Sequence, residues 1–326
     1  MEKIRIGIVG TANIATRSVI PEIINLDDKF HLAGIASRDG KKAEKYAAQF
    51  STVAFPSYDA LLNSKQCDAV YIPLPNALHY PYAKKALLNN LHVLVEKPLA
   101  TDPDQVADLI DTARERNLLL MENFQFRFHS QLQYLIQSLR NGVIGELRAL
   151  NAAFCFPPFP DSDNIRYRKD LEGGALLDAG AYTAKISSII LGNDITVKAA
   201  SLHINQEKMV DTWGSAFLKD TNSSLTASLT FGFDNFYQCG IRALGSKGLL
   251  TTNRLFTARE DHVPVFELEI NGKPKEVIKL KPDNHFKHML ETFHGNISDD
   301  DAKEREHTAN LLQSSLLAAI KKKANA

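Results

Sequence analysis

The stretch VLVEKP, residues 93–98, decides the fold of this chain. A wholly apolar run ends there in an acid, a base and a proline. The run from Leu91 to Val95 shows no polar alternation, which indicates a strand buried on both faces in the middle of a parallel sheet. Pro98 ends the strand because it cannot continue the hydrogen-bond ladder. Open α/β sheets bind ligands at this end of their strands, so we expect Lys97 half-buried at a cleft; the alternative is an ordinary surface lysine.

Similar short apolar runs surround this strand and alternate with helical patterns. That alternation predicts βαβ units and a doubly wound parallel sheet, an α/β fold that occupies residues 1–122. A helix is expected from about Asp102, its N-cap, to Asn117. The other predicted strands are Ile4–Val9, His31–Ala36, Ala69–Ile72 and Leu118–Met121.

Composition narrows the classes of protein. The 326 residues suggest two domains, and Lys+Arg and Asp+Glu both total 38, so the balanced charge favours neither nucleic acid nor an anionic membrane as a partner. The start of the chain enters a strand pattern directly and does not read as a signal peptide, and no run is long enough to span a membrane. Three widely spaced cysteines show no metal or disulfide spacing, so we expect no metal and a reducing, cytoplasmic location.

The first strand leads into a turn of the kind that binds dinucleotides. Gly10, Ala12 and Ala15 occupy the places of the three glycines of the fingerprint, before a helical pattern. Backbone N–H groups at such a helix start hold a pyrophosphate. Alone this motif is weak, and its place between strand and helix strengthens it. The predicted cofactor contacts here are Gly10, Thr11, Ala12, Asn13 and Ile14.

The second strand ends in Ser37-Arg38-Asp39, where NAD enzymes usually carry an acid for the ribose 2′-hydroxyl. A hydroxyl and a guanidinium suit a 2′-phosphate instead, and Lys42 adds a second positive charge. We therefore favour NADP(H) over NAD(H). The alternative is a solvated helix start with ordinary surface bases.

The third strand ends in a loop with further candidates for the cofactor site. Asn76 is predicted as the N-cap of the next helix. His79 could line the cleft, although packing is the favoured role. Pro73, Asn76, His79 and Glu96 complete the predicted cofactor-binding set.

The character of the chain changes after Glu122. Residues 123–326 read as an α+β domain with a large, mostly antiparallel sheet and helices on one face. Asn271-Gly272 predicts a type I′ hairpin turn, and a final helix is expected from Asp301 to Lys322. The predicted strands are Val197–Asn205, Trp213–Lys219, Ser224–Phe233, Tyr237–Leu244, Phe266–Ile270 and Glu276–Leu280, with Leu147–Phe156 before them.

A glycine pair, Gly173-Gly174, precedes a segment that looks helical from Ala175 on. Asp178 and Tyr182 are four residues apart and so lie one turn from each other on one face. An acid and a phenol there make a plausible acid/base pair; the alternative is a local cap and a core tyrosine. Lys185 could share the face, and its role stays open.

Taken together, these motifs resemble the Gfo/Idh/MocA family of NAD(P)-dependent oxidoreductases over almost the whole length of the chain. The resemblance rests on the Gly10 turn, Ser37-Arg38-Asp39, YIPLPN at 71–76, EKP at 96–98 and GGALLD at 173–178. It implies an N-terminal Rossmann domain and a C-terminal domain whose open sheet often serves subunit assembly, hence a homodimer or homotetramer.

The resemblance also implies catalytic roles. Lys97 corresponds to the active-site lysine, often with a cis peptide to Pro98, and Asp178 and Tyr182 fall at the other catalytic positions. Tyrosine there, where many members have histidine, is similar to aldose dehydrogenases, dihydrodiol dehydrogenases and above all sugar-nucleotide 3-ketoreductases. A phenol of pKa about 10 is a poor base at neutral pH, so the Lys97 ammonium and Tyr182 make sense as a unit.

The substrate side is less constrained by the sequence. The implied reaction moves a hydride between nicotinamide and a carbonyl or hydroxyl of a carbohydrate or sugar nucleotide. A non-catalytic, cofactor-binding regulator is the alternative class, and the presence of all three catalytic candidates argues against it. Arg127, Arg166 and Arg168 are candidates to hold substrate hydroxyls or a diphosphate; solvated charges or a structural ion pair remain open for them.

Overall fold

The computed structural model describes residues 2–326, and the chain divides into two compact units. The first unit consists of the residues up to Phe124 together with Phe286–Leu311, and the second of Gln125–His285 with Leu312–Ala326. The sequence places everything after residue 122 in one domain; in the structure Phe286–Leu311 groups with the first unit.

The first unit contains a six-stranded sheet in the order β3-β2-β1-β4-β5-β6, and every neighbouring pair is parallel. This order reverses direction between β1 and β4, which is where doubly wound sheets form their ligand crevice. The expected α/β class is confirmed. The strands are β1 (Ile4–Val9), β2 (Phe30–Ala36), β3 (Ala54–Phe55), β4 (Ala69–Ile72), β5 (His92–Glu96) and β6 (Leu120–Asn123).

Helices follow each of these strands except the last. Asp102 caps α5 as expected, because its carboxylate accepts from the Asp104 N–H at 2.9 Å. α8 was not anticipated from the sequence. The helical segments are η1 (Ala15–Val19), α1 (Ile20–Asn25), α2 (Gly40–Gln49), α3 (Tyr58–Leu62), η2 (Asn76–Leu78), α4 (His79–Leu88), α5 (Pro103–Glu115), α8 (His285–Asn296) and α9 (Asp300–Ala324), whose last residues group with the second unit.

The second unit contains an eight-stranded sheet in the order β14-β13-β12-β11-β7-β10-β9-β8. Its neighbours are antiparallel except for the central pair β7 and β10, which is parallel, so the mostly antiparallel sheet is confirmed. The strands are β7 (Leu147–Cys155), β8 (Ile195–Asn205), β9 (Val210–Asp220), β10 (Thr226–Gly232), β11 (Gln238–Gly245), β12 (Gly248–Asn253), β13 (Val265–Ile270) and β14 (Glu276–Lys279).

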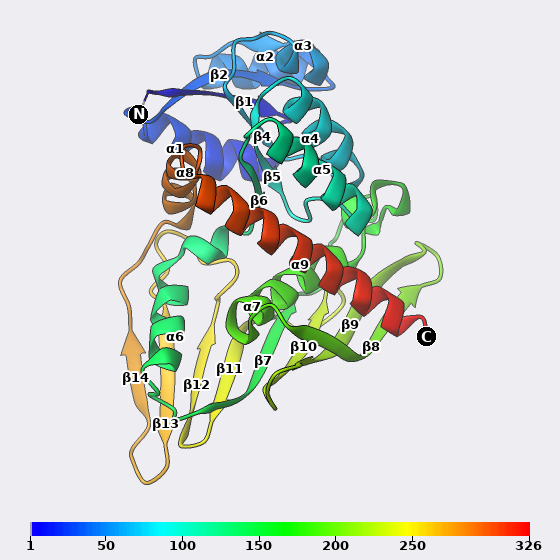
Figure 1. The fold of residues 1–326 in the computed structure, drawn as a ribbon. Coiled ribbons are helices and arrows are strands. Elements are labelled where there is room, and N and C mark those ends of the chain that lie inside the picture. The colour runs from blue at the N-terminus through cyan, green and yellow to red at the C-terminus, as the bar shows by residue number, and fades with distance from the viewer. Residues whose placement is uncertain (1) are drawn as a thin grey trace. The chain divides into compact units, whose positions relative to one another are not determined.

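One face of this sheet is covered and the other is open. The helices α6 (Ser130–Arg140) and α7 (Ala181–Leu191) lie over the covered face (Figure 1). Tyr134 of α6 packs on Phe266 of β13, with ring centroids 4.8 Å apart. A row of buried residues that pair in register crosses this face: Phe266, Thr252, Ile241, Ala152, Leu229 and Ala216.

Two expectations for this unit are wrong. β12 was not predicted, and Asn271-Gly272 is not a type I′ turn. That turn needs positive φ at both central residues, and only Gly272 has one, at 76°. The connection runs over five residues, Asn271 to Lys275, because β13 ends at Ile270 and β14 begins at Glu276.

Two absences hold over residues 2–326. No helix there is long and apolar enough to cross a membrane. The three cysteines, Cys67, Cys155 and Cys239, are all free and buried.

Candidate active site

The turn after β1 has the geometry that the dinucleotide fingerprint requires. Gly10 has φ +124°, and a Cβ on it would lie 2.9 Å from a methyl group of Leu74, so only glycine fits without strain. The chain becomes helical at Asn13 and passes through the π-helical segment η1. Thr11, Ala12 and Ile14 are half-buried around this helix start. The residues present therefore fit a pyrophosphate held by backbone N–H groups.

The end of β2 presents the groups predicted to select the cofactor. Ser37 is buried, and its Oγ accepts from the Asp39 N–H at 3.2 Å, which leaves the hydroxyl hydrogen to be donated elsewhere. Arg38 and Lys42 are exposed beside it, the latter in the first turn of α2. A donor hydroxyl flanked by two cations fits a 2′-phosphate better than a 2′-hydroxyl.

Three adjacent strand ends converge on Glu96. Its Oε1 accepts from the Tyr71 hydroxyl of β4 at 2.6 Å and from Asn123 Nδ2 of β6 at 2.7 Å. Although Glu96 keeps some exposed surface, enclosure of its carboxylate by protein raises its pKa; the hydrogen bonds from Tyr71 and Asn123 and the charge of Lys97 oppose that rise. The sequence did not identify Tyr71 or Asn123 as partners. The register, which pairs Glu96 with Asn123, is the signal that finds the second.

Lys97 stands on a short segment that buried side chains hold in place. Its peptide bond to Pro98 is cis, as the resemblance implied, and the residue is half-buried as expected. The Leu99 N–H donates to the Glu122 carboxylate at 2.9 Å. His79 is fully buried, with its ring nitrogens 2.6 Å from the carbonyl oxygens of Leu74 and Pro98.

His79 therefore ties the loop after β4 to the loop after β5, which is the packing role that the sequence favoured. Burial lowers its pKa, against the effect of the two carbonyls. The expectation that Asn76 caps the next helix is wrong. Asn76 is the first residue of the 3₁₀ turn η2, whose N-cap position is Pro75, and the N-cap position of α4 is Leu78. Pro73 is buried at the end of β4.

In the second unit, the glycine pair is required by close backbone contacts. A Cβ on Gly173 would lie 2.4 Å from the carbonyl oxygen of Arg166, and Gly174 has φ +120° with an Asp211 oxygen 2.3 Å from its ideal Cβ position. That Asp211 carboxylate, from β9, accepts from the Leu176 N–H at 2.6 Å. Burial raises the pKa of Asp211, and its backbone hydrogen bonds oppose the rise.

The segment after the pair is not the plain α-helix expected from Ala175. Leu176–Gly180 is a π-helical segment, η6, and α7 begins only at Ala181. π-Bulges of this kind are frequent at functional sites. Asp178 lies in η6 and Tyr182 in the first turn of α7, so the predicted pair is carried by the junction of the two.

Asp178 is held by an arginine from the preceding loop. Arg166 Nε donates to Asp178 Oδ2 at 2.6 Å, and the side chains are 33% and 16% exposed. Burial lowers the pKa of Arg166, but the carboxylate beside it reverses this and the net pKa is raised. Of the possibilities left open for Arg166, a structural ion pair is the one observed.

The other two candidate substrate arginines are placed differently. Arg168 is exposed and donates through Nε and Nη2 to the exposed Asp170 carboxylate, at 2.7 and 2.5 Å. Arg127 lies in the 3₁₀ turn η3 (Gln125–Phe128), with its guanidinium 5.2 Å from the ring centroid of Phe128. Their contact with a substrate stays a prediction.

Tyr182 is 6% exposed and lies among aromatic rings. Its hydroxyl is 3.3 Å from Gln125 Nε2 and 3.4 Å from Gln125 Oε1. The ring centroids of Phe126, Phe154 and Phe256 are 5.8, 5.1 and 5.8 Å from its own. The sequence analysis did not predict that these aromatic rings surround Tyr182, because they come from η3, β7 and the loop after β12, which are far apart in the chain.

Lys185, left open by the sequence, is 2% exposed within α7. A lysine is almost never so deeply buried unless it is paired. Lys185 interacts with a neighbouring group of the protein, as this rule leads one to expect. It lies three residues after Tyr182, one turn further along the same helix.

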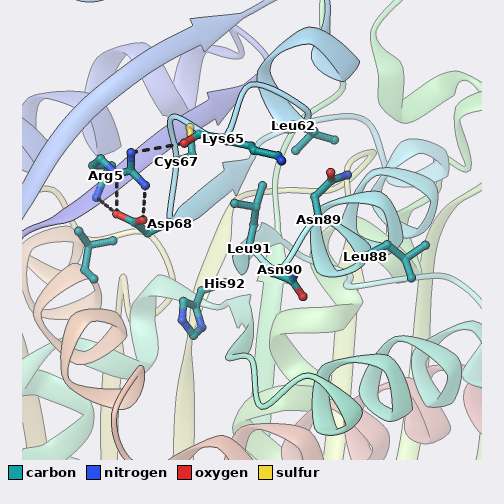
Figure 2. A pocket seen from close by; sticks show the side chains of 11 residues that line it. Arg5, Leu62, Lys65, Cys67, Asp68, Leu88, Asn89, Asn90, Leu91 and His92 are labelled. Atoms are coloured by element: carbon teal, nitrogen blue, oxygen red, sulfur yellow. Dashed lines mark hydrogen bonds and ion pairs between the residues drawn. The ribbon is translucent and has the colours of Figure 1, made fainter.

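Within the first unit, a cavity lies away from Glu96 and Lys97. It has a volume of about 510 Å³ and is lined by residues at the amino ends of β1, β4 and β5, the opposite end from Glu96 and Lys97 (Figure 2). The ion pair of Arg5 and Asp68, with 2.6 Å between Nη2 and Oδ1, fills part of its wall. Within residues 2–326, no three His, Cys, Asp or Glu side chains come together as a metal site.

Comparison with known proteins agrees with this arrangement. Residues 4–124 match the model of an oxidoreductase family with an NAD-binding Rossmann fold, Gfo/Idh/MocA, and residues 132–251 match the C-terminal domain of that family. A dTDP-3,4-didehydro-2,6-dideoxy-alpha-D-glucose 3-reductase from Streptomyces antibioticus is 37% identical over 95% of this chain and 94% of its own.

Two further relatives extend the comparison. A solved 3-ketoreductase from Actinomadura kijaniata, in complex with NADP and TDP-benzene, superposes with a TM-score of 0.94 at 36% identity and covers 99% of this chain and 98% of its own. An NADP(+)-dependent D-xylose 1-dehydrogenase from Haloferax volcanii is 32% identical over 88% of this chain and 87% of its own.

Proposed function

Because the chain belongs to the Gfo/Idh/MocA family of oxidoreductases, we propose that it is an NADP(H)-dependent ketoreductase acting on a keto sugar attached to a nucleoside diphosphate. The observation that carries the proposal is the similarity to 3-ketoreductases of dTDP-sugars over almost the full length of the chain, in sequence and in structure. The acid/base residues that such a reduction needs, Lys97, Asp178 and Tyr182, are all present.

The reaction needs a hydride, a proton and stabilisation of the charge that forms on the carbonyl oxygen. When bound, the reduced nicotinamide supplies the hydride. Lys97 and Tyr182 donate hydrogen bonds to that oxygen, where preorganised donors act most strongly on the transition state, and one of them delivers the proton. Asp178 orients the donors. Pro73, Asn76 and Glu96 would hold the nicotinamide half of the cofactor.

The preference for NADP(H) rests on Ser37, Arg38 and Lys42. Fluorescence titration of the purified protein with NADPH and NADH tests it, and we expect NADPH to bind at least about tenfold more tightly, since an arginine–phosphate contact contributes about 1.5–3 kcal/mol. Arg38→Ala removes most of this difference, while Lys45→Ala, an exposed change further along α2, does not. Equal or tighter binding of NADH by the wild type contradicts the preference.

The substrate class is tested by a screen that follows NADPH absorbance. We expect reduction of dTDP-3-keto-6-deoxy sugars and no comparable turnover of the free sugar, because the nucleotide supplies binding energy that truncated substrates lack. Oxidation of D-xylose or of a trans-dihydrodiol, with no activity on the nucleotide sugar, supports an aldose or dihydrodiol dehydrogenase instead.

The free cysteines accord with the cytoplasmic location that belongs to this proposal.

The open face of the eight-stranded sheet supports a homodimer or homotetramer. Trp213, Phe217 and Leu244 are 41%, 40% and 47% exposed on it, and Trp213 stacks on His203 with ring centroids 5.0 Å apart. Exposed apolar surface of this kind marks association sites. Light scattering after gel filtration is expected to give a multiple of the 36.2 kDa chain mass, and Phe217→Glu to give the monomer. A monomeric wild type contradicts assembly.

A further inference from the structure

We propose that Arg166 is a positioning residue of the active site: it fixes the Asp178 carboxylate and places a permanent positive charge beside the Tyr182 phenol, instead of binding the substrate's diphosphate. The inference deepens the proposed function and rests on it for its kinetic part.

Arg166 holds the Asp178 carboxylate in a defined position. The Nε donor of Arg166 lies 2.6 Å from Asp178 Oδ2, a distance typical of a strong charge-assisted hydrogen bond. The backbone of Asp178 is fixed as well, because its N–H donates to the carbonyl oxygen of Gly174, just before the π-helical segment, at 3.1 Å. The carboxylate is therefore held at one place without any substrate present.

The Arg166 guanidinium is itself held in place by an aromatic ring and by Asn164. The Arg166 guanidinium lies over the ring of Phe159, with its central carbon 4.6 Å from the ring centroid. Phe159 in turn packs on Phe156 and Phe233, with centroids 5.3 and 6.1 Å away. Asn164 Oδ1 accepts from both the Arg166 backbone N–H and Nη1, at 3.2 and 3.4 Å.

These contacts commit two of the five N–H donors of the Arg166 guanidinium to the protein. Nε is bound to Asp178 and Nη1 to Asn164, and one face of the fork is covered by Phe159. Bidentate recognition of a diphosphate needs two free, parallel N–H groups, so a substrate that used the Nε side of the guanidinium would have to break the Asp178 pair. Loss of one partner from this partly buried ion pair leaves a charge without its counter-charge, which is disfavoured.

The positive charge of the Arg166 guanidinium is also connected to Tyr182. Burial lowers the pKa of Arg166, whereas the Asp178 carboxylate and, after it, the phenols of Tyr182 and Tyr167 raise this pKa. Asp178 and Tyr182 are carried by consecutive turns of one helical segment. A fixed cation near a phenol favours the phenolate, and so makes the phenol a better proton donor near neutral pH.

One test needs no substrate. The ultraviolet difference titration of tyrosinate, taken as wild type minus Tyr182→Phe, isolates Tyr182 among the nine tyrosines. With Arg166→Met in both members of the pair, we expect its ionisation to move up by about one pH unit or more. Arg166→Lys keeps the charge and is expected to stay near the wild type. An unchanged curve with Arg166→Met overturns the link to Tyr182.

The second test separates positioning from binding. With the nucleotide sugar, Arg166→Met is expected to lower kcat about 10²-fold while KM changes less than about threefold. Arg166→Lys should restore part of kcat, because it returns the charge without the fork. Arg148→Met, a change at an exposed arginine of β7 that pairs with the exposed Glu146 at 3.1 Å, is the matched control and should behave like the wild type.

The outcomes separate the two hypotheses. A tenfold or larger rise in KM with kcat unchanged makes Arg166 a substrate ligand and overturns the inference. A wild type that does not reduce nucleotide sugars, combined with a shifted Tyr182 titration, defeats the proposed function and leaves the positioning role standing. Circular dichroism confirms that each variant is folded, and Arg166→Lys carries the test if Arg166→Met is not.

Discussion

The two units build their candidate catalytic groups in different ways. In the first, Glu96 and Lys97 stand at the end of a parallel strand, and the partners of Glu96, Tyr71 and Asn123, stand at the ends of the strands on either side. In the second, Asp178 lies in a π-helical turn whose partners come from a loop and from β9. Strand order alone brings the first set together, whereas the second depends on side-chain contacts across irregular backbone.

The largest effect is expected at the strand end. Lys97→Met should lower kcat by about 10³-fold or more, because it removes both a charge and a proton donor from the reacting oxygen. NADPH affinity, measured by fluorescence titration, should change less than about threefold. Lys84→Met, at a surface lysine of α4 paired with Asp108, is the control. Retained turnover in Lys97→Met would show that the strand end only binds the cofactor.

A smaller loss is expected on the helical side. Tyr182→Phe should lower kcat about 10²-fold and leave KM near the wild-type value. The ring keeps its contacts with Phe126, Phe154 and Phe256, and the lost hydrogen bond to Gln125 costs at most about 1 kcal/mol of unfolding free energy. Steady-state kinetics and urea unfolding measure the two effects. A collapse of stability in this variant would assign the phenol to the fold and not to catalysis.

Removal of the carboxylate charge should change the free energy of unfolding in opposite directions at Asp178, in the second unit, and at Glu96, in the first. Asp178→Asn leaves the half-buried Arg166 guanidinium without its counter-charge, so we expect the unfolding free energy to fall by about 1–3 kcal/mol. Urea unfolding of the wild type and the variant at neutral pH measures it. A stability equal to the wild type would mean that the Arg166 contact contributes nothing.

Glu96→Gln is expected to raise the unfolding free energy at neutral pH, by about 1 kcal/mol, while activity falls. The folded-state pKa of Glu96 is raised above the ordinary 4.5, so its contribution to stability is full below pH 4.5 and is lost as the pH rises through the folded pKa. The difference in unfolding free energy between Glu96→Gln and the wild type should therefore disappear below about pH 4.5. Unfolding curves at several pH values test this, and a variant less stable at neutral pH contradicts it.

Sequence reasoning worked best where local signals and topology agree. The bounds of β1 and β4 follow from their apolar runs, and the turn at Gly10 follows from the dinucleotide fingerprint; both are observed. The cis peptide before Pro98, which the resemblance implies, is observed as well. A doubly wound sheet then places Ser37, Glu96 and Lys97 at the carboxyl ends of strands, whatever the loops do.

It worked least well where an alternative backbone geometry has the same residue pattern. A π-turn and an α-turn place apolar residues at similar spacings, so η6 could not be told from a helix at Ala175. Asn76 has the chemistry of a cap, but Pro75 precedes a 3₁₀ turn there. Arg166 lies in a short 3₁₀ turn, Ile165–Tyr167, 12 residues before Asp178, and nothing in the spacing predicts which arginine pairs with Asp178.

The hydrogen bond from the Leu176 N–H to Asp211 gives the second unit a built-in reporter. The two residues are 35 positions apart, so the turn that carries Asp178 cannot be completed until β9 has joined the sheet. The Leu176 amide should exchange with deuterium at the rate of β9 and not at that of an isolated helix start. Measured by native-state hydrogen exchange, it would show whether the acid is in place in partly unfolded forms of the protein.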